Sequence, residues 1–181
     1  VFLHGTVAVH MIARQIQHRG DLNGEGFRRR VACREGNDRG VGQAFENFAD
    51  GTAREGAHVI RKIESTGNRR IVLCERGASF GYRNLAADMR SLPIMRELGY
   101  PVVMDATHSV QRPGGLGTGS GGDGKYAPAL ARAAVAVGVD GIFMETHVNP
   151  AKALSDKSNA IAFKNLAKLW KDLLAIDNIV R

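Results

Sequence analysis

The sequence has few cysteines and no long apolar run. Only Cys33 and Cys74 occur among the 181 residues, and this pair fits neither a zinc motif nor a disulfide framework. We therefore expect a reducing, cytoplasmic location. No apolar stretch reaches the roughly 18 residues of a membrane-spanning helix, and the first residues lack the apolar core of a signal peptide. These features predict neither a membrane protein nor a secreted disulfide scaffold.

Aromatic residues are also scarce, at 6%, while the net charge is +7. A basic balance is typical of proteins that bind nucleic acids or anionic substrates. The densest basic clusters, Arg28–Arg30 and Arg69–Arg70, have no aromatic residues interleaved among their arginines. We therefore expect no nucleic-acid partner, because an anionic sugar phosphate explains the charge at least as well.

The first 57 residues differ in character from the rest. They contain eight arginines and nine glycines but no lysine and no proline. Neither the helical nor the strand period persists between residues 17 and 43, and residues 42–49 have the pattern of a short helix. We expect residues 1–57 to be an unmatched segment, either poorly structured or the product of a frameshifted reading, and residues 58–181 to form a separate unit.

From residue 58 onward, short apolar strands alternate with helices, which predicts the α/β class. Such strands are buried on both faces and are typical of a parallel sheet. Three strands do not close a barrel of eight, so the pattern fits a small open sheet or part of a barrel. The helices are predicted at 58–66, 84–99 with a break near Pro93, 126–138 and 160–180. The strands are predicted within 69–77, 100–109 and 139–147.

Ionisable side chains follow the predicted strands. In parallel α/β folds the chemistry lies at the carboxyl ends of the strands, so these groups are expected on one face. Imidazole and carboxylate groups suit a divalent ion such as Zn, Fe, Mn or Co, although each could instead cap a strand end or lie in solvent. The metal-capable residues are Asp105, His108, Glu145, His147 and Asp156.

Two further features suggest anion binding. Arg76 directly follows the first predicted strand, where a guanidinium group can hold a carboxylate or phosphate or form a salt bridge with Glu75. Residues 114–122 form a glycine-rich loop that does not match a P-loop, because Tyr126 stands where Ser or Thr is required. We expect that loop to be a mobile lid over the site.

Three ordered motifs resemble the 3-deoxy-D-manno-octulosonate 8-phosphate synthases. The first is LCERGASFGY at 73–82 with NLAADMRSLPIM at 84–95, and the second is DATHSVQRPGG at 105–115 with SGG at 120–122. The third is FMETH at 143–147 with ALSD at 153–156. The resemblance covers about residues 58–181.

The resemblance implies a transferase of lipopolysaccharide biosynthesis, a TIM (β/α)8 barrel that condenses phosphoenolpyruvate with D-arabinose 5-phosphate and releases phosphate. The chain would be an incomplete barrel carrying the last three β/α units. The family enzyme would be a homo-oligomer with no membrane partner. A related heptulosonate or sialate synthase and a non-catalytic half-barrel fragment remain alternatives.

The resemblance also assigns roles to individual residues. The metal-dependent branch implies a divalent ion held by His108, Glu145 and Asp156, of which His108 and Asp156 are also catalytic. The substrate-binding residues implied are Arg76, His108, Gln111 and Ser120. The family's N-terminal cysteine ligand has no counterpart, since Cys33 lies in a different motif. The N-terminal substrate lysines also lack counterparts, so we expect this chain alone to be nearly inactive.

Overall fold

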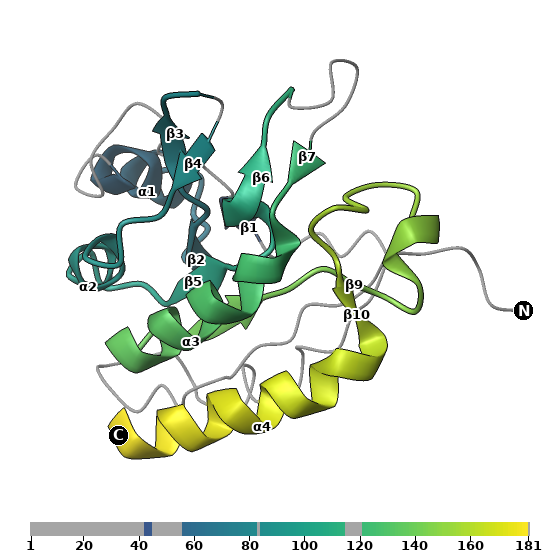
Figure 1. Ribbon diagram of the computed structural model, residues 1–181. Helices are drawn as coiled ribbons and strands as arrows, with labels where there is room; N and C mark the ends of the chain where they lie inside the picture. Colours follow the sequence, from purple (N-terminus) through teal and green to yellow (C-terminus); the bar gives the residue numbers. More distant parts are fainter. Residues whose placement is uncertain (1–41, 45–55, 83, 115–120, 181) are drawn as a thin grey trace, which may run out of the picture.

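The computed structural model of the chain describes residues 42–44, 56–82, 84–114 and 121–180. Its centre is a parallel sheet of four strands in the order β1-β2-β5-β8 (Figure 1). The pairing register matches Leu73 with Val102 and Val103 with Gly141, so the strands end at one edge. The strands are β1 (Gly42–Ala44), β2 (Ile71–Glu75), β5 (Val102–Asp105) and β8 (Gly141–Phe143).

In the described part of the chain, four α-helices accompany this sheet. Helices α2 and α3 pack against its strands, and α4 lies alongside α3 as an outer layer (Figure 1). No helix in the described residues is both long and apolar enough to cross a membrane. The helices are α1 (Gly56–Glu64), α2 (Ser91–Arg96), α3 (Ala127–Val137) and α4 (Phe163–Val180).

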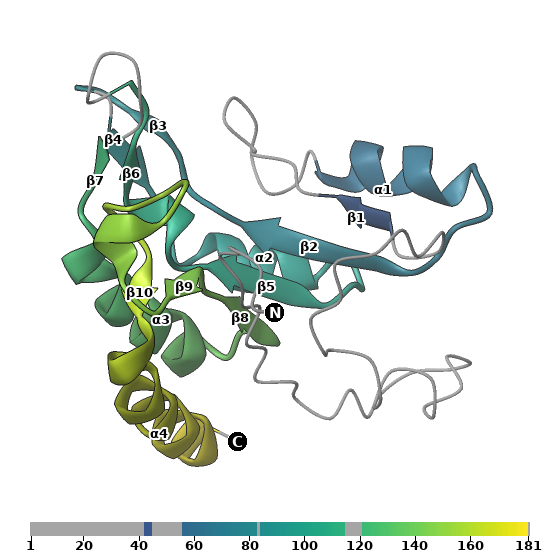
Figure 2. The ribbon, with the colours of Figure 1, turned by 90° about the vertical axis from the view of Figure 1, so that its right-hand side faces the viewer.

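Small paired strands and 3-10 turns follow the carboxyl ends of β2, β5 and β8, and lie together at one end of the sheet (Figure 2). They form three two-stranded sheets: β3 (Ala78–Phe80) with β4 (Asn84–Ala86), β6 (Gln111–Arg112) with β7 (Gly121–Gly122), and β9 (Thr146–His147) with β10 (Ile161–Ala162). The turns are η1 (His108–Val110), η2 (Gly124–Tyr126) and η3 (Pro150–Lys152).

The two faces of the sheet have different roles. Side chains alternate along a strand, so the register places Leu73, Val102 and Met104 on the face that packs against the helices. These side chains are almost completely buried. The opposite face carries Cys74 and Asp105, and Asp105 starts the functional site. The same short strands thus supply both the core and the chemistry.

The alternation predicted from residue 58 onward is confirmed, with three corrections. Residues 161–162, predicted as part of the last helix, form strand β10, because they pair with β9. Residues 42–44 form strand β1 rather than the start of a helix, because they pair with β2. The predicted helix over 84–99 is too long: residues 84–86 form a hairpin with 78–80, and only Ser91–Arg96 is helical. Pro93 does not break that helix, because it lies in the first turn, where no backbone N–H is needed.

The parallel α/β class is therefore present, and β1 adds a fourth strand to the three predicted. The prediction for residues 1–57 lies outside the described residues, except at 42–44 and 56–57.

Adjacent leucines on α4 test the proposed core. Leu173 is fully buried, whereas Leu174 is 39% exposed. Leu173→Ala is expected to lower the free energy of unfolding by about 2–5 kcal/mol, since it leaves a cavity between α3 and α4. Leu174→Ala should cost under about 1 kcal/mol. Chemical denaturation of the two variants provides the comparison, and equal losses would contradict this packing.

Candidate functional site

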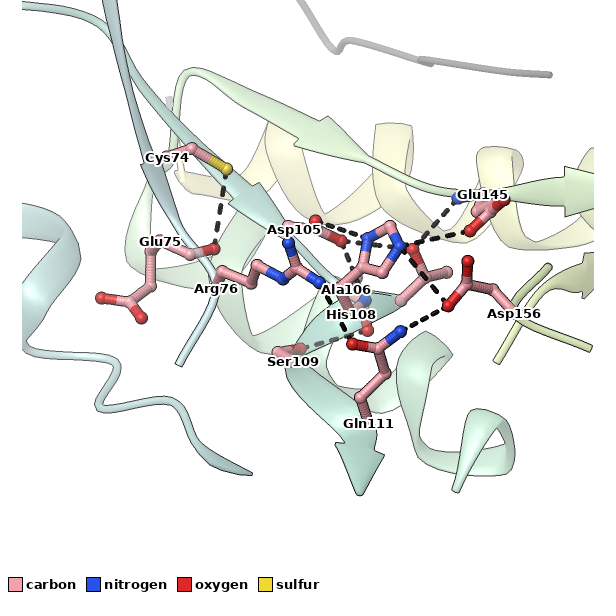
Figure 3. Close-up of polar contacts among 11 residues, drawn as sticks. Cys74, Glu75, Arg76, Asp105, Ala106, His108, Ser109, Gln111, Glu145 and Asp156 are labelled. Atoms are coloured by element: carbon pink, nitrogen blue, oxygen red, sulfur yellow. Dashed lines mark hydrogen bonds and ion pairs between the residues drawn. The ribbon is translucent and has the colours of Figure 1, made fainter. Parts of the chain in front are cut away.

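A buried carboxylate orients His108 at the end of β5. Asp105 is 2% exposed, and its Oδ1 accepts hydrogen bonds from the His108 backbone N–H at 2.9 Å and the Thr107 hydroxyl at 3.2 Å. Its Oδ2 lies 2.7 Å from His108 Nδ1. The imidazole also packs on the Phe143 ring, with 5.7 Å between centroids. These contacts direct Nε2 away from the strand (Figure 3).

Two carboxylates from other segments face that nitrogen. Glu145 Oε2 lies 3.3 Å and Asp156 Oδ1 3.8 Å from His108 Nε2. One ligand atom from each of the three residues lies within 4.8 Å of the others. Glu145 follows β8, and its backbone N–H donates to Thr107 Oγ1 at 3.1 Å. The Thr107 hydroxyl therefore joins the end of β5 to the segment that carries Glu145.

Asp156 reaches the cluster from a turn with a left-handed backbone. Its φ is +50°, in a region that aspartate and asparagine adopt more readily than most other L-residues. Its carbonyl accepts two hydrogen bonds at 2.9 Å, from the N–H groups of Asn159 and Ala160, which hold the turn. The turn places Asp156 Oδ1 3.8 Å from His108 Nε2.

Burial and mutual repulsion act on the carboxylates. Burial raises the pKa of Glu145, and the negative charge of Asp156 raises it further. Glu145 Oε2 is buried and accepts no hydrogen bond within the described residues. An anionic oxygen without a donor, next to a second carboxylate, is costly for the protein alone. A divalent cation between these groups would remove that cost.

The pKa of His108 is set by opposing influences. Burial lowers it, but the hydrogen bond to Asp105 and the charges of Asp105 and Asp156 raise it, and the net result lies above the ordinary value. Asp105 on Nδ1 fixes the ring in the way that carboxylates orient metal-binding histidines. One imidazole nitrogen and two carboxylates together suit Zn, Fe, Mn or Co. The residues present therefore fit a divalent metal ion.

Arg76 approaches the cluster from the end of β2. Its guanidinium donates to Gln111 Oε1 at 3.1 Å, and Gln111 Nε2 donates to Asp156 Oδ1 (Figure 3). Glu75 forms no ion pair with Arg76 in the described structure. Instead it accepts hydrogen bonds from the Gly77 N–H, at 2.6 Å, and from the Ser91 hydroxyl. Glu75 thereby fixes the turn that carries Arg76.

The structure brings together most of the residues predicted to form the site. Asp105 lies behind His108 rather than beside the two carboxylates. His147 is not part of the cluster, and its Nδ1 accepts the Asn149 N–H at 2.9 Å. Ser120 and most of the glycine-rich loop lie outside the described residues. The clustered residues are Arg76, His108, Gln111, Glu145 and Asp156.

Two supporting residues were not predicted. Thr107 links Asp105 to Glu145, and Glu75 fixes the Arg76 turn. The sequence signal for these supporting roles was that each residue directly precedes a predicted site residue, His108 or Arg76. Hydroxyl and carboxylate groups beside a strand end have many alternative uses, however, so spacing alone did not reveal these contacts.

Comparisons with known proteins identify a matching family model and similar curated proteins. A family model described as the DAHP synthetase I family matches residues 42–179. The 2-dehydro-3-deoxyphosphooctonate aldolase of Dichelobacter nodosus is 59% identical over 124 residues, which are 68% of this chain and 45% of that protein. Its counterpart of the same name in Geobacter sulfurreducens is 60% identical over 124 residues, 68% of this chain and 46% of that protein.

A more divergent relative gives the same result. The 2-dehydro-3-deoxyphosphooctonate aldolase of Xanthomonas axonopodis pv. citri is 56% identical over 123 residues, which are 68% of this chain and 45% of that protein. The chain thus spans less than half the length of these curated relatives.

Removing the Glu145 charge should stabilise the metal-free protein. Because its folded-state pKa is raised above the ordinary 4.5, the folded state loses stability as the pH rises from about 4.5 through that pKa. Glu145→Gln should therefore raise the free energy of unfolding at neutral pH, by about 1 kcal/mol. The gain should disappear below about pH 4.5. Denaturant unfolding with a chelator present, across this pH range, measures the difference.

A matched control separates this effect from a general effect of net charge. Glu97 is exposed just after α2, so Glu97→Gln should change stability by less than about 0.5 kcal/mol at any pH. If Glu145→Gln destabilises the metal-free protein at neutral pH, the carboxylate is not electrostatically strained and the interpretation is wrong.

Proposed function

This chain belongs to the DAHP synthetase I family, and from that premise we propose that it carries the metal and phosphoenolpyruvate site of an octulosonate phosphate synthase. The enzyme condenses phosphoenolpyruvate with D-arabinose 5-phosphate to 3-deoxy-D-manno-octulosonate 8-phosphate and phosphate, for lipopolysaccharide biosynthesis. The names and the 56–60% identity of the curated relatives support this choice of substrates.

One observation carries the proposal. Three potential metal ligands and an arginine, carried by the segments after β2, β5 and β8, meet at one end of a parallel sheet. Gln111 hydrogen-bonds both Arg76 and Asp156 there. That end of the sheet is where α/β enzymes place their chemistry. Two neighbouring, mutually repelling carboxylates in a largely enclosed cluster do not stabilise the fold, because an apolar cluster of similar size would be more stable.

His108, Glu145 and Asp156 would hold the divalent ion, with Asp105 keeping His108 Nε2 directed at it. A bound ion of this kind supplies Lewis acidity toward an aldehyde oxygen or orients a water molecule. Among the remaining residues, Arg76 would bind the phosphoenolpyruvate anion and offset its charge during bond formation. Gln111 and Ser120 would contact substrate, and His108 and Asp156 would lie closest to the reacting groups.

The fold proposal follows the same reasoning. We propose that β2, β5 and β8 correspond to the last three strands of a TIM barrel, so that the described sheet is part of an incomplete barrel. Strand β1 extends that sheet on the β2 side. The family enzyme would assemble as a homo-oligomer, and its N-terminal cysteine ligand would lie in a part of the relatives that this chain does not match.

Metal binding tests the proposed ligands without any need for turnover. His108→Ala should weaken Co2+ binding by more than about 100-fold, since losing a ligand costs more than losing an outer partner. His58→Ala is the control, because His58 is exposed on α1 and should leave Co2+ binding unchanged. Competition with a chelating dye measures both. Equal binding by the wild type and His108→Ala would overturn the metal assignment.

Activity of the chain alone gives a second test. We expect at most a trace of phosphate release from phosphoenolpyruvate with D-arabinose 5-phosphate present, because the relatives' other half has no match in this chain. Lost positioning of two anionic substrates is worth several kcal/mol of barrier, on the order of a thousandfold in rate or more. Rapid, arabinose 5-phosphate-dependent release, abolished by His108→Ala, would contradict this expectation.

A further inference from the structure

We propose that Gln111 is a positioning residue that fixes the metal-binding carboxylate and the anion-binding arginine at the same time. This inference rests on the proposed function, and it assigns Gln111 a role beyond substrate contact. The observation behind it is that one half-buried side chain contacts both sites: Oε1 accepts from Arg76 at 3.1 Å and Nε2 donates to Asp156 Oδ1. Within the described residues, no other side chain hydrogen-bonds both groups.

The chemistry of the two neighbours determines which residue can stand between them. Arginine offers only donors and an ionised aspartate only acceptors, so the group between them needs one acceptor and one donor. A neutral amide supplies both, with its oxygen facing Arg76 and its NH2 group facing Asp156. A glutamate would pair with Arg76 but repel Asp156. A lysine or arginine would pair with Asp156 but repel Arg76.

The backbone around Gln111 is itself held rigidly. Its N–H donates to the His108 carbonyl at the end of η1, so the residue is tied to the same turn as the proposed metal ligand. On its other side it pairs with Gly122 in the β6–β7 ladder. Gly122 has no room for a side chain, because a Cβ there would lie 1.6 Å from Asn159 Oδ1. Asn159 belongs to the turn that carries Asp156.

This arrangement has a consequence for Arg76. In the described structure the guanidinium has one hydrogen-bonded partner, a neutral one, and it forms no ion pair with the nearby carboxylates. Its positive charge is therefore not neutralised, and its remaining N–H groups are available to an anion. Gln111 would hold Arg76 in position without competing for that charge.

Separate binding assays on the 181-residue chain test the proposal. Co2+ affinity is measured by dye competition without phosphoenolpyruvate, and phosphoenolpyruvate affinity by calorimetry without metal. Gln111→Leu keeps the side-chain volume and removes both hydrogen bonds. It should weaken Co2+ binding about tenfold, as loss of a residue that supports a metal ligand does, and weaken phosphoenolpyruvate binding at least threefold. The Co2+ visible spectrum should also change, because Asp156 loses its fixed orientation.

Four comparison variants show whether the effect is specific to the Gln111 amide. Arg76→Ala should weaken phosphoenolpyruvate binding and leave the Co2+ affinity unchanged, whereas Gln111→Leu weakens both affinities. His108→Ala, at a proposed metal ligand, should weaken Co2+ binding more than Gln111→Leu does. Gln111→Glu should weaken phosphoenolpyruvate binding more than tenfold, since the new carboxylate would neutralise the charge of Arg76. Arg112→Gln alters the exposed neighbour in β6, which pairs with Asp123 at 2.6 Å, and should change neither affinity.

The outcomes separate the two proposals. Suppose that the wild-type chain binds both Co2+ and phosphoenolpyruvate. If Gln111→Leu then leaves one of the two affinities unchanged and also leaves the Co2+ spectrum unchanged, the positioning role is wrong and the proposed function stands. The role is also wrong if Arg112→Gln reproduces the loss, or if Gln111→Glu binds phosphoenolpyruvate as the wild type does. If the wild-type chain binds neither ligand, both proposals fail together.

Discussion

The hydrogen bond between Asp105 and His108 Nδ1 determines the geometry of the whole cluster. Asp105 ends a strand that is buried along its full length, so its carboxylate has almost no access to water and depends on protein donors. Those donors are the backbone and ring of His108 and the hydroxyl of Thr107. Satisfying one buried charge therefore orients the imidazole and, through Thr107, also locates the segment that carries Glu145.

The carboxylates of the cluster lie where an apolar core would not place them. Glu145 has a buried oxygen that accepts no hydrogen bond within the described residues, next to the carboxylate of Asp156. That arrangement costs stability and persists because the surrounding structure imposes it. The sheet and its helices supply that constraint through a core of ordinary aliphatic side chains. Stability and chemistry thus come from opposite faces of the same strands.

The sequence was most informative where local pattern and tertiary structure agree. The runs at 71–74 and 102–104 are apolar throughout, and the structure confirms them as buried strands. Prediction failed at residues 42–44 and 84–86, whose strand state depends on partners elsewhere in the chain. The cluster of His108, Glu145 and Asp156 was expected from the resemblance, whereas the contacts of Glu75, Thr107 and Gln111 depend on side-chain geometry that spacing does not encode.

The central claim is that His108, Glu145 and Asp156 hold one divalent ion beside Arg76. Crystals of the chain grown with Co2+ and measured at the cobalt absorption edge test it directly. The account predicts one anomalous peak about 2.0–2.2 Å from His108 Nε2 and from a carboxylate oxygen of both Glu145 and Asp156, the distances typical of first-row divalent ions. A fully occupied peak elsewhere, with none among these three side chains, would contradict it.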